Sequence, residues 1–371
     1  MKALLLSFIC ASLASAAPTV SLVRLPMHGK QPQVATDAKG TAHIVFLAGK
    51  ERASDVYYVT RKDGKSSQPM KVNAIPGSAV AVGTIRGPHL ALGKYGRVHV
   101  AWNGSQAAGG RPHHGSPMLY TRMKLDGSGF EKEGDLMTWT TALDGGGSVA
   151  ADGKGNVHVV WHAAPKDSPK GENVRGVFVA TSQDGGKTFA KEKLISTKKG
   201  TCGCCGLKSF TDDKGQLFTL YRSAQKVVNR DMTLLIGHEP GKARESVVGP
   251  WKIGQCVMSS AAFTQTPKGV LGAWEAQSNI FVGPLDGKSD ARKIARHARQ
   301  RHPSIAVNKA GDTLVAWSEN TGWKKGGRLA WQIVPHKPTD GALPHGGRAG
   351  MPAWSFSAAI ALKNGNFEIL Y

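Results

Sequence analysis

Short apolar segments alternate with polar, glycine-containing turns along almost the whole chain. A typical unit has one apolar run such as residues 88–92 (PHLAL), a turn with a glycine and a second run such as 97–102 (RVHVAW). A variable loop then leads to a third run such as 176–181 (GVFVAT). Short apolar segments at even spacing, with almost no helical periodicity, predict an all-β fold.

A glycine recurs six residues ahead of an aromatic residue that ends the second apolar run of each unit. The pairs are Gly40/Phe46, Gly96/Trp102, Gly155/Trp161, Gly215/Tyr221, Gly311/Trp317 and Gly365/Tyr371, with Gly269/Trp274 one residue shorter. Successive aromatic residues lie 43 to 60 positions apart. This period is typical of the four-stranded blades of a β-propeller, and seven pairs predict seven blades. Because the last pair ends at the final residue, we expect residues 19–25 (TVSLVRL) to complete the last blade and close the ring.

The first sixteen residues have the pattern of a cleavable secretory signal. Lys2 precedes an apolar run over residues 3–14, and Ala14-Ser15-Ala16 forms a small-residue cleavage site. No later apolar stretch is long enough to span a bilayer. We therefore expect residues 17–371 to form one propeller domain that is secreted or periplasmic.

The chain is strongly basic, with 48 Lys and Arg against 26 Asp and Glu and a formal net charge of +22. This charge favours acidic partners. Because the basic residues are scattered and the chain carries an export signal, we expect an anionic glycan or sugar acid and no nucleic acid. The alternative is a basic surface that only maintains solubility. The sequence does not indicate an oligomeric state.

Residues 182–189 (SQDGGKTF) match the pattern S-x-D-x-G-x-T-F, the Asp box of the sialidase-like propellers. The chain therefore resembles this family in its repeat architecture, and the family's six-bladed sialidases make six the alternative blade count. In such a turn, polar side chains accept amide protons, glycine takes a positive φ, and the aromatic ring packs between strands. We expect a structural hairpin between the third and fourth strands of a blade, remote from the ligand face. Its residues are Ser182, Asp184, Gly186, Thr188 and Phe189.

In a propeller, the start of each innermost strand and the end of each second strand lie at the same face. Residues at these positions therefore converge on a central funnel. The expected ligand-binding set comprises Arg52, Arg86, His89, His162, Arg222, Arg230, Arg301 and His302. Arg86 and Arg301 each stand two residues before a proline, which resembles the Arg-x-Pro signature of sialidases. That resemblance implies arginines that bind the carboxylate of a sugar acid.

The resemblance to sialidases also implies an aspartate acid/base and a glutamate that activates a tyrosine nucleophile. Asp55, Asp231 and Glu275 are the candidate catalytic carboxylates. The nucleophile is unassigned, because the late tyrosine Tyr371 is also suited to packing at a strand end. Lys30 stands where the family has an arginine in the first blade. Three interpretations stay open: an exo-sialidase-type glycoside hydrolase, a non-catalytic propeller that binds glycans or the cell envelope, and a propeller whose cysteines serve a metal or redox role.

Four cysteines are expected to gather where the fourth and fifth blades begin: Cys202, Cys204, Cys205 and Cys256. In an exported chain an even number favours two disulfides. Bonds to Cys256 are preferred, since a bond between adjacent Cys204 and Cys205 is strained. The alternative is a thiolate site for copper(I) or zinc, which would make the protein a metal or redox propeller, and no other cofactor is expected. The segments CGCCG, LYRSA, NRDM and AWE resemble an exported bacterial branch of the sialidase-like propellers.

Overall fold

The computed structural model describes residues 17–109, 115–226, 228–286, 290–294, 299–336, 344–347 and 349–371. The predicted signal, residues 1–16, lies outside these ranges. Within them, we find no helix with the length and apolar character needed to cross a membrane.

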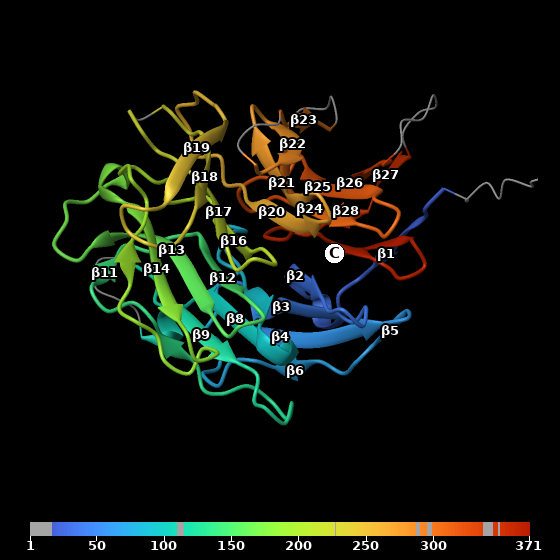
Figure 1. The fold of residues 1–371 in the computed structure, drawn as a ribbon, viewed down its shortest axis with the longest axis horizontal. Helices are drawn as coiled ribbons and strands as arrows, with labels where there is room; N and C mark the ends of the chain where they lie inside the picture. The colour runs from blue at the N-terminus through green and yellow to red at the C-terminus, as the bar shows by residue number, and fades with distance from the viewer. Residues whose placement is uncertain are drawn as a thin grey trace, which may run out of the picture.

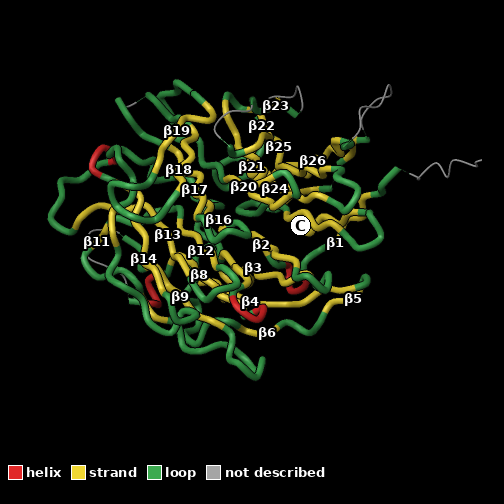
Figure 2. The backbone as a smooth tube through the Cα atoms, viewed as in Figure 1, coloured by secondary structure: helices red, strands yellow, loops and turns green. Residues whose placement is uncertain are grey.

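The described residues form seven β-sheets, each a blade, and Figures 1 and 2 show the chain passing once around the ring. The first blade has β2 (Lys30–Thr36), β3 (Ala42–Lys50), β4 (Ala53–Lys62), β5 (Lys65–Ser66) and β6 (Met70–Lys71). The second has β7 (His89–Leu92), β8 (Val98–Asn103), β9 (Met118–Arg122) and β10 (Gly134–Asp135). The third has β11 (Thr140–Thr141), β12 (Gly147–Ala151), β13 (Val157–Pro165), β14 (Gly176–Ser182) and β15 (Lys193–Leu194).

The remaining blades continue the same order. The fourth has β16 (Lys208–Thr211), β17 (Leu217–Arg222), β18 (Met232–Ile236) and β19 (Arg244–Gly249). The fifth has β20 (Ala261–Thr266), β21 (Gly269–Ala276), β22 (Asn279–Pro284) and β23 (Arg292–Lys293). The sixth has β24 (Gln300–Val307), β25 (Thr313–Glu319), β26 (Gly327–Val334), β27 (His345–Gly346) and β28 (Gly350–Met351). The seventh has β29 (Ala358–Ala361), β30 (Phe367–Leu370) and β1 (Val20–Val23). Short 3-10 helices lie at Pro26–His28, Lys94–Gly96, Gln106–Ala108 and Glu172–Val174.

The N-terminal strand closes the ring, as the sequence predicts. β1 pairs in parallel with β30, from Val20 opposite Phe367 to Val23 opposite Leu370. The innermost strands also contact one another in a closed series, from β2 through β7, β12, β16, β20, β24 and β29 back to β2. The count of seven blades is therefore confirmed, and the six-bladed alternative is wrong.

The repeated glycines are required by backbone geometry. All seven, at the turn between the first and second strands of a blade, have φ between 74° and 118°. Residues with a Cβ rarely adopt this left-handed region. The aromatic residues that follow from Phe46 to Trp317 are at most 3% exposed. Each repeat thus combines one turn that needs glycine with one ring that fills the space between blades.

Second strands read as continuous apolar runs because each blade is covered on both faces by its neighbours. β8, β17 and β25 are buried along their whole length. The polar side chains inside such strands bond to the adjacent strand, as the 2.7 Å contact between His99 Nδ1 and Tyr120 Oη shows. A buried polar group without such a partner would destabilise the fold.

The Asp box occupies the turn between β14 and β15 and orders itself through its own side chains. Asp184 accepts the backbone amides of Lys187 and Thr188, each at 2.9 Å, while Ser182 Oγ accepts the Gly186 amide at 2.8 Å. A Cβ on Gly186 would lie 1.8 Å from the hydroxyl oxygen of Tyr120 in the second blade. Phe189 packs edge-on against the same tyrosine. The motif therefore joins two blades and lies away from the strand ends that form the candidate site.

We expect the buried ion pair that joins the first and last blades to contribute to ring stability. Arg61 Nε and Nη2 donate to Glu368 at 2.6 and 2.8 Å, and Glu368 is buried. Glu368→Gln should lower the free energy of unfolding by about 1.5 to 3 kcal/mol, because it leaves the guanidinium without a charged acceptor. Urea unfolding followed by tryptophan fluorescence measures the change.

The matched control is Glu239→Gln, which removes an ion pair with Lys242 on the surface. This variant should change stability by less than about 0.5 kcal/mol, because exposed pairs contribute little. Equal effects of the two variants would contradict a role for Arg61 and Glu368 in closure.

Candidate functional site

Several of the predicted funnel residues meet where the third to sixth blades begin their inner strands. Arg222, at the end of β17, donates from Nη2 to the backbone carbonyl of Glu275 in β21 at 2.7 Å. His302 in β24 lies 3.1 Å from Ser260 Oγ through its Nδ1 atom. Arg301 and Cys205 both act electrostatically on the Glu275 carboxyl. The structure thus brings the fourth, fifth and sixth blades together around one buried acid.

Glu275 is the most perturbed carboxyl group of this cluster. Its side chain belongs to a residue only 1% exposed, and its Oε2 atom has no hydrogen-bond partner among the described residues. Burial raises the pKa of Glu275 to about 7, and this outweighs the lowering by Arg222, Ser259 and Arg301. A carboxyl group in this state can gain or lose a proton near neutral pH.

Three of the predicted arginines are already held by groups of the protein. Arg86 donates to the Asp144 carboxylate and, at 2.6 Å, to its backbone carbonyl. Arg222 is 1% exposed and donates to two backbone carbonyls, and its guanidinium lies 5.3 Å from the centre of the Trp251 ring. Arg230 is paired with Glu172 at 2.6 Å. The guanidinium groups of these arginines hold protein groups of this face in place and are therefore not free to bind a ligand.

Two further arginines have no such partner among the described residues, and one of them, Arg301, lies near the buried acid. Arg301 is half-buried and makes no side-chain hydrogen bond or ion pair with the described residues; it acts electrostatically on Glu275 and His302. Arg175, which the sequence analysis did not select, has a buried Nε without a partner and lies beside His162. Arg52 is exposed in the turn between β3 and β4. Arg301 is thus the predicted arginine best placed to contact a bound anion.

The other two candidate carboxylates already accept hydrogen bonds from other groups of the protein. Asp55 accepts from Asn73 at 2.8 Å and from the Gly77 amide at 2.7 Å, and pairs with Lys71 at 2.9 Å. Burial alone would raise the pKa of Asp55, but these donors together lower it. This keeps the carboxylate charged and disfavours the acid role expected for it. Asp231 Oδ1 accepts the backbone amide of Trp251 at 2.7 Å.

The three predicted histidines are buried and uncharged at neutral pH. Burial and the nearby Arg175 lower the pKa of His162 to about 3, against a smaller opposing effect of a hydrogen bond with the Cys205 backbone. Burial and Arg301 lower the pKa of His302 to about 3, and burial beside Lys208 lowers that of His89 well below its ordinary value. The histidines therefore add polar atoms to this face and no positive charge.

Lys208 and Gln33 form a polar bridge across the central axis that the sequence analysis did not identify. Lys208 Nζ donates to Gln33 Oε1 at 2.5 Å and lies 3.4 Å from His89 Nδ1. Burial lowers the pKa of Lys208 to about 8. A cavity of about 510 Å³ lies along the axis, lined by Lys208 and by residues from the innermost strands of all seven blades. The only sequence signal was that Lys208 starts an inner strand.

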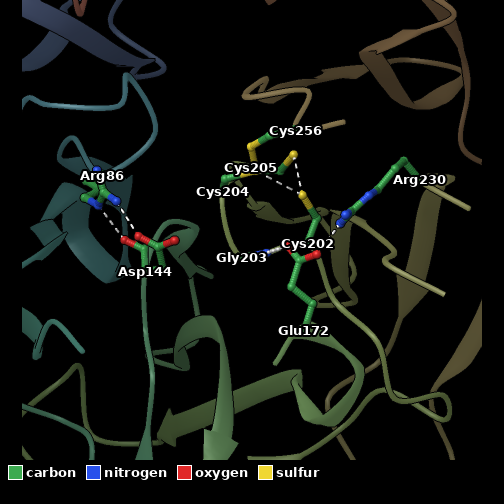
Figure 3. The surroundings of a disulfide bond; sticks show 9 residues. All are labelled: Arg86, Asp144, Glu172, Cys202, Gly203, Cys204, Cys205, Arg230 and Cys256. Atoms are coloured by element: carbon green, nitrogen blue, oxygen red, sulfur yellow. Dashed lines mark hydrogen bonds and ion pairs between the residues drawn. A yellow bond between two sulfur atoms is a disulfide. The ribbon is translucent and has the colours of Figure 1, made fainter. Parts of the chain in front are cut away.

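The four cysteines are close together, as predicted, but they form one disulfide instead of two. Cys204 is bonded to Cys256, while Cys202 and Cys205 are free and buried. Figure 3 shows the free pair beside the disulfide, with Cys202 Sγ 2.9 Å from Cys205 Sγ and 3.5 Å from Cys204 Sγ. The Sγ atoms of Cys202, Cys204 and Cys205 could also hold a thiophilic metal, but only after the disulfide is reduced.

Glu172 ties the cysteine loop to the neighbouring blade. Its carboxylate accepts the Gly203 amide at 2.7 Å through one oxygen and pairs with Arg230 through the other. Figure 3 shows this carboxylate beside the sulfur atoms, with the Arg86–Asp144 pair across the face from them. Glu172 fixes the position of residue 203 between two of the cysteines, and no sequence pattern pointed to it.

Comparisons with known proteins establish the fold and leave the reaction open. No protein-family model matches the sequence, and no curated protein matches it. An α-L-arabinanase from Penicillium chrysogenum, solved with arabinobiose, is similar with a TM-score of 0.54 and 13% identity over 84% of this chain and 94% of that chain. An α-L-arabinofuranosidase from Fusarium graminearum, also with arabinobiose, has a TM-score of 0.54 and 12% identity over 83% and 93%. A Hadza microbial sialidase has a TM-score of 0.52 and 12% identity over 86% and 74%. This chain is thus a seven-bladed propeller that resembles carbohydrate-active enzymes in fold.

We expect Glu275 to make stability fall as pH rises. Because its pKa of about 7 is above the ordinary carboxyl value, the folded protein binds this proton more tightly than the unfolded chain does. The stability from that proton is present at low pH and is lost as pH rises through about 7. From about pH 5 to about pH 8, wild type should lose about 2 to 3 kcal/mol more unfolding free energy than Glu275→Gln.

Urea titrations at the two pH values measure this difference. Asp213→Asn, which removes an exposed carboxylate, is the control and should follow wild type. A pH dependence of Glu275→Gln that equals that of wild type would show that the carboxyl group titrates in its ordinary range.

Proposed function

We propose that this protein acts on anionic glycans at the face formed by the third to sixth blades, with Glu275 as the proton-transferring group and Arg301 as the anion contact. The observation that carries the proposal is the buried Glu275 carboxyl, with a pKa of about 7 and one oxygen that no described residue bonds. It lies next to Arg301, which makes no side-chain hydrogen bond or ion pair with the part of the chain that the structure describes. A general acid is most effective when its pKa is near the working pH.

The net charge of the chain and the fold that it shares with carbohydrate-active enzymes both support an anionic glycan as the substrate. A net charge of +22 favours anionic polymers at long range. Arabinobiose occupies two solved propellers of similar fold, and a third is named a sialidase. With the predicted export signal, the substrate would be a sugar acid or anionic polysaccharide outside the cytoplasm. The basic residues that face it would select the carboxylate.

In this proposal, Glu275 protonates the leaving oxygen of the glycosidic bond. Glycoside hydrolysis ordinarily uses two carboxyl groups, one that donates a proton and one that acts as base or nucleophile. Asp231 remains the candidate for the second role, although it already accepts a backbone amide, whereas Asp55 lies in the first blade, outside this face. A sialidase-type nucleophile stays unassigned. We therefore propose glycan cleavage by proton donation and do not assign the stereochemical course.

Arg301→Ala should weaken binding of acidic oligosaccharides. Loss of one charge-assisted contact predicts an increase in Kd of about 10- to 100-fold. Calorimetric titrations with sialylated and uronic-acid oligosaccharides measure it, and the affinity of wild type should fall with added salt. Arg292→Ala removes an arginine from the exposed outer strand β23 and is the matched control. Unchanged affinity in Arg301→Ala would overturn the proposed anion contact.

Glu275→Gln should retain binding and lose turnover. Removal of a general acid predicts a decrease in kcat of about 100- to 10,000-fold with Kd nearly constant. Release of reducing sugar from the same oligosaccharides measures turnover. Binding by wild type without turnover would support the non-catalytic interpretation and overturn the role of Glu275 in proton transfer.

A further inference from the structure

The cysteine cluster contains a buried pair of thiols in contact with a disulfide that reaches the surface. Cys202 and Cys205 are 1% and 2% exposed, whereas Cys256 is exposed. Cys202 Sγ lies between the two possible partners, 2.9 Å from Cys205 Sγ and 3.5 Å from Cys204 Sγ. The sulfur atoms therefore form a continuous path from the core to the solvent (Figure 3).

We propose that these four cysteines are a thiol–disulfide exchange centre, in which the buried pair Cys202/Cys205 transfers two electrons to the exposed disulfide Cys204–Cys256. The proposal does not depend on the glycan chemistry assigned to Glu275. A purely structural role would require only the Cys204–Cys256 bond, and it would leave the contact between two buried thiols without a purpose.

The exchange needs two steps and no outside reactant. First, the Cys202 proton passes to Cys205, and the Cys202 thiolate attacks Cys204 Sγ. The bond between Cys204 and Cys256 breaks, and Cys256 leaves as an exposed thiolate. Second, Cys205 attacks Cys202 Sγ, forming the Cys202–Cys205 disulfide, while Cys204 leaves and takes the proton. One disulfide is consumed and one is formed, so that electrons and protons balance.

The surroundings of the pair favour one thiolate. Cys202 Sγ donates a hydrogen bond to Cys205 Sγ at 2.9 Å, and the Arg222 guanidinium acts electrostatically on Cys205. The thiolate is the reactive form of cysteine, and here it lies next to the proton that must move.

The loop geometry keeps the three sulfurs of the motif together. Glu172 accepts the Gly203 amide, and Cys202 donates its own amide to the Arg222 carbonyl at 2.9 Å. On the other side, the Gly206 amide donates to the Ser259 carbonyl at 2.8 Å. The backbone is therefore anchored on each side of the cysteines. After transfer, Cys256 would present a reduced thiol at the surface to an external disulfide.

The test locates the disulfide in mature wild-type protein that carries one disulfide per chain. The protein is purified without reductant, acid quenching stops exchange, and alkylation followed by peptide mass spectrometry identifies the bonded pair. We expect both Cys204–Cys256 and Cys202–Cys205 to be present, in a ratio that stays constant once equilibrium is reached. Finding only Cys204–Cys256 at all times would overturn the proposal, because the bond would then be a static crosslink.

Two variants distinguish thiol–disulfide exchange from an effect on the packing of the cluster. Cys205→Ser should abolish the second step, so that the Cys202–Cys205 bond is lost and Cys204–Cys256 or Cys202–Cys204 remains. Trp251→Phe alters the packing around the cluster but leaves every sulfur and is the control that should exchange like wild type. Circular dichroism checks that each variant is folded. Isolation of wild type with a thiolate-bound metal and no disulfide, by elemental analysis and thiol counting, would also overturn the proposal.

Discussion

The parallel pairing of β1 with β30 is the contact on which the rest of the structure depends. It places residues from the two ends of the chain in one blade, 347 positions apart where the Thr19 amide meets Asn366. Every other blade is built from sequence-local hairpins, so this pairing, together with the Arg61–Glu368 ion pair and the contact between β2 and β29, fixes the relation between the first and last blades. Once the ring is closed, the starts of all seven innermost strands must face one opening. Arg222 and Glu275, which are far apart in the sequence, can then contact each other, although no local sequence pattern predicts this contact.

The positive charge of the candidate face is largely used within the protein. Arg86 and Arg230 pair with partly exposed carboxylates, and Arg222 donates to backbone carbonyls at this face. Burial of these polar groups would be destabilising without such partners. The result is a rigid framework around Glu275 and Arg301, which are left with incomplete internal bonding. Incomplete bonding at a buried acid is uncommon in stable folds and is typical of positions that meet a ligand.

The fold could be predicted from sequence because its determinants are local. A positive-φ glycine and a buried aromatic ring six residues later leave the same pattern in each blade, and their recurrence gave the blade number. The positions of Arg86 and Cys256 near the opening were predictable for the same reason. The partners of the predicted side chains were not, since Asp144 reaches Arg86 from the next blade and Glu172 reaches Gly203 from a loop. Side-chain pairing between blades depends on rotamers and distances that no spacing rule contains.

The bridge between Lys208 and Gln33 has a consequence for the axial cavity. It links the fourth blade to the first across the central axis, near the start of β16. Lys208 also lines that cavity, so the bridge places an ammonium group and an amide group at the end of the cavity that faces the candidate site. A molecule entering the cavity from this side would therefore meet polar side chains first and would have to displace their hydrogen bond.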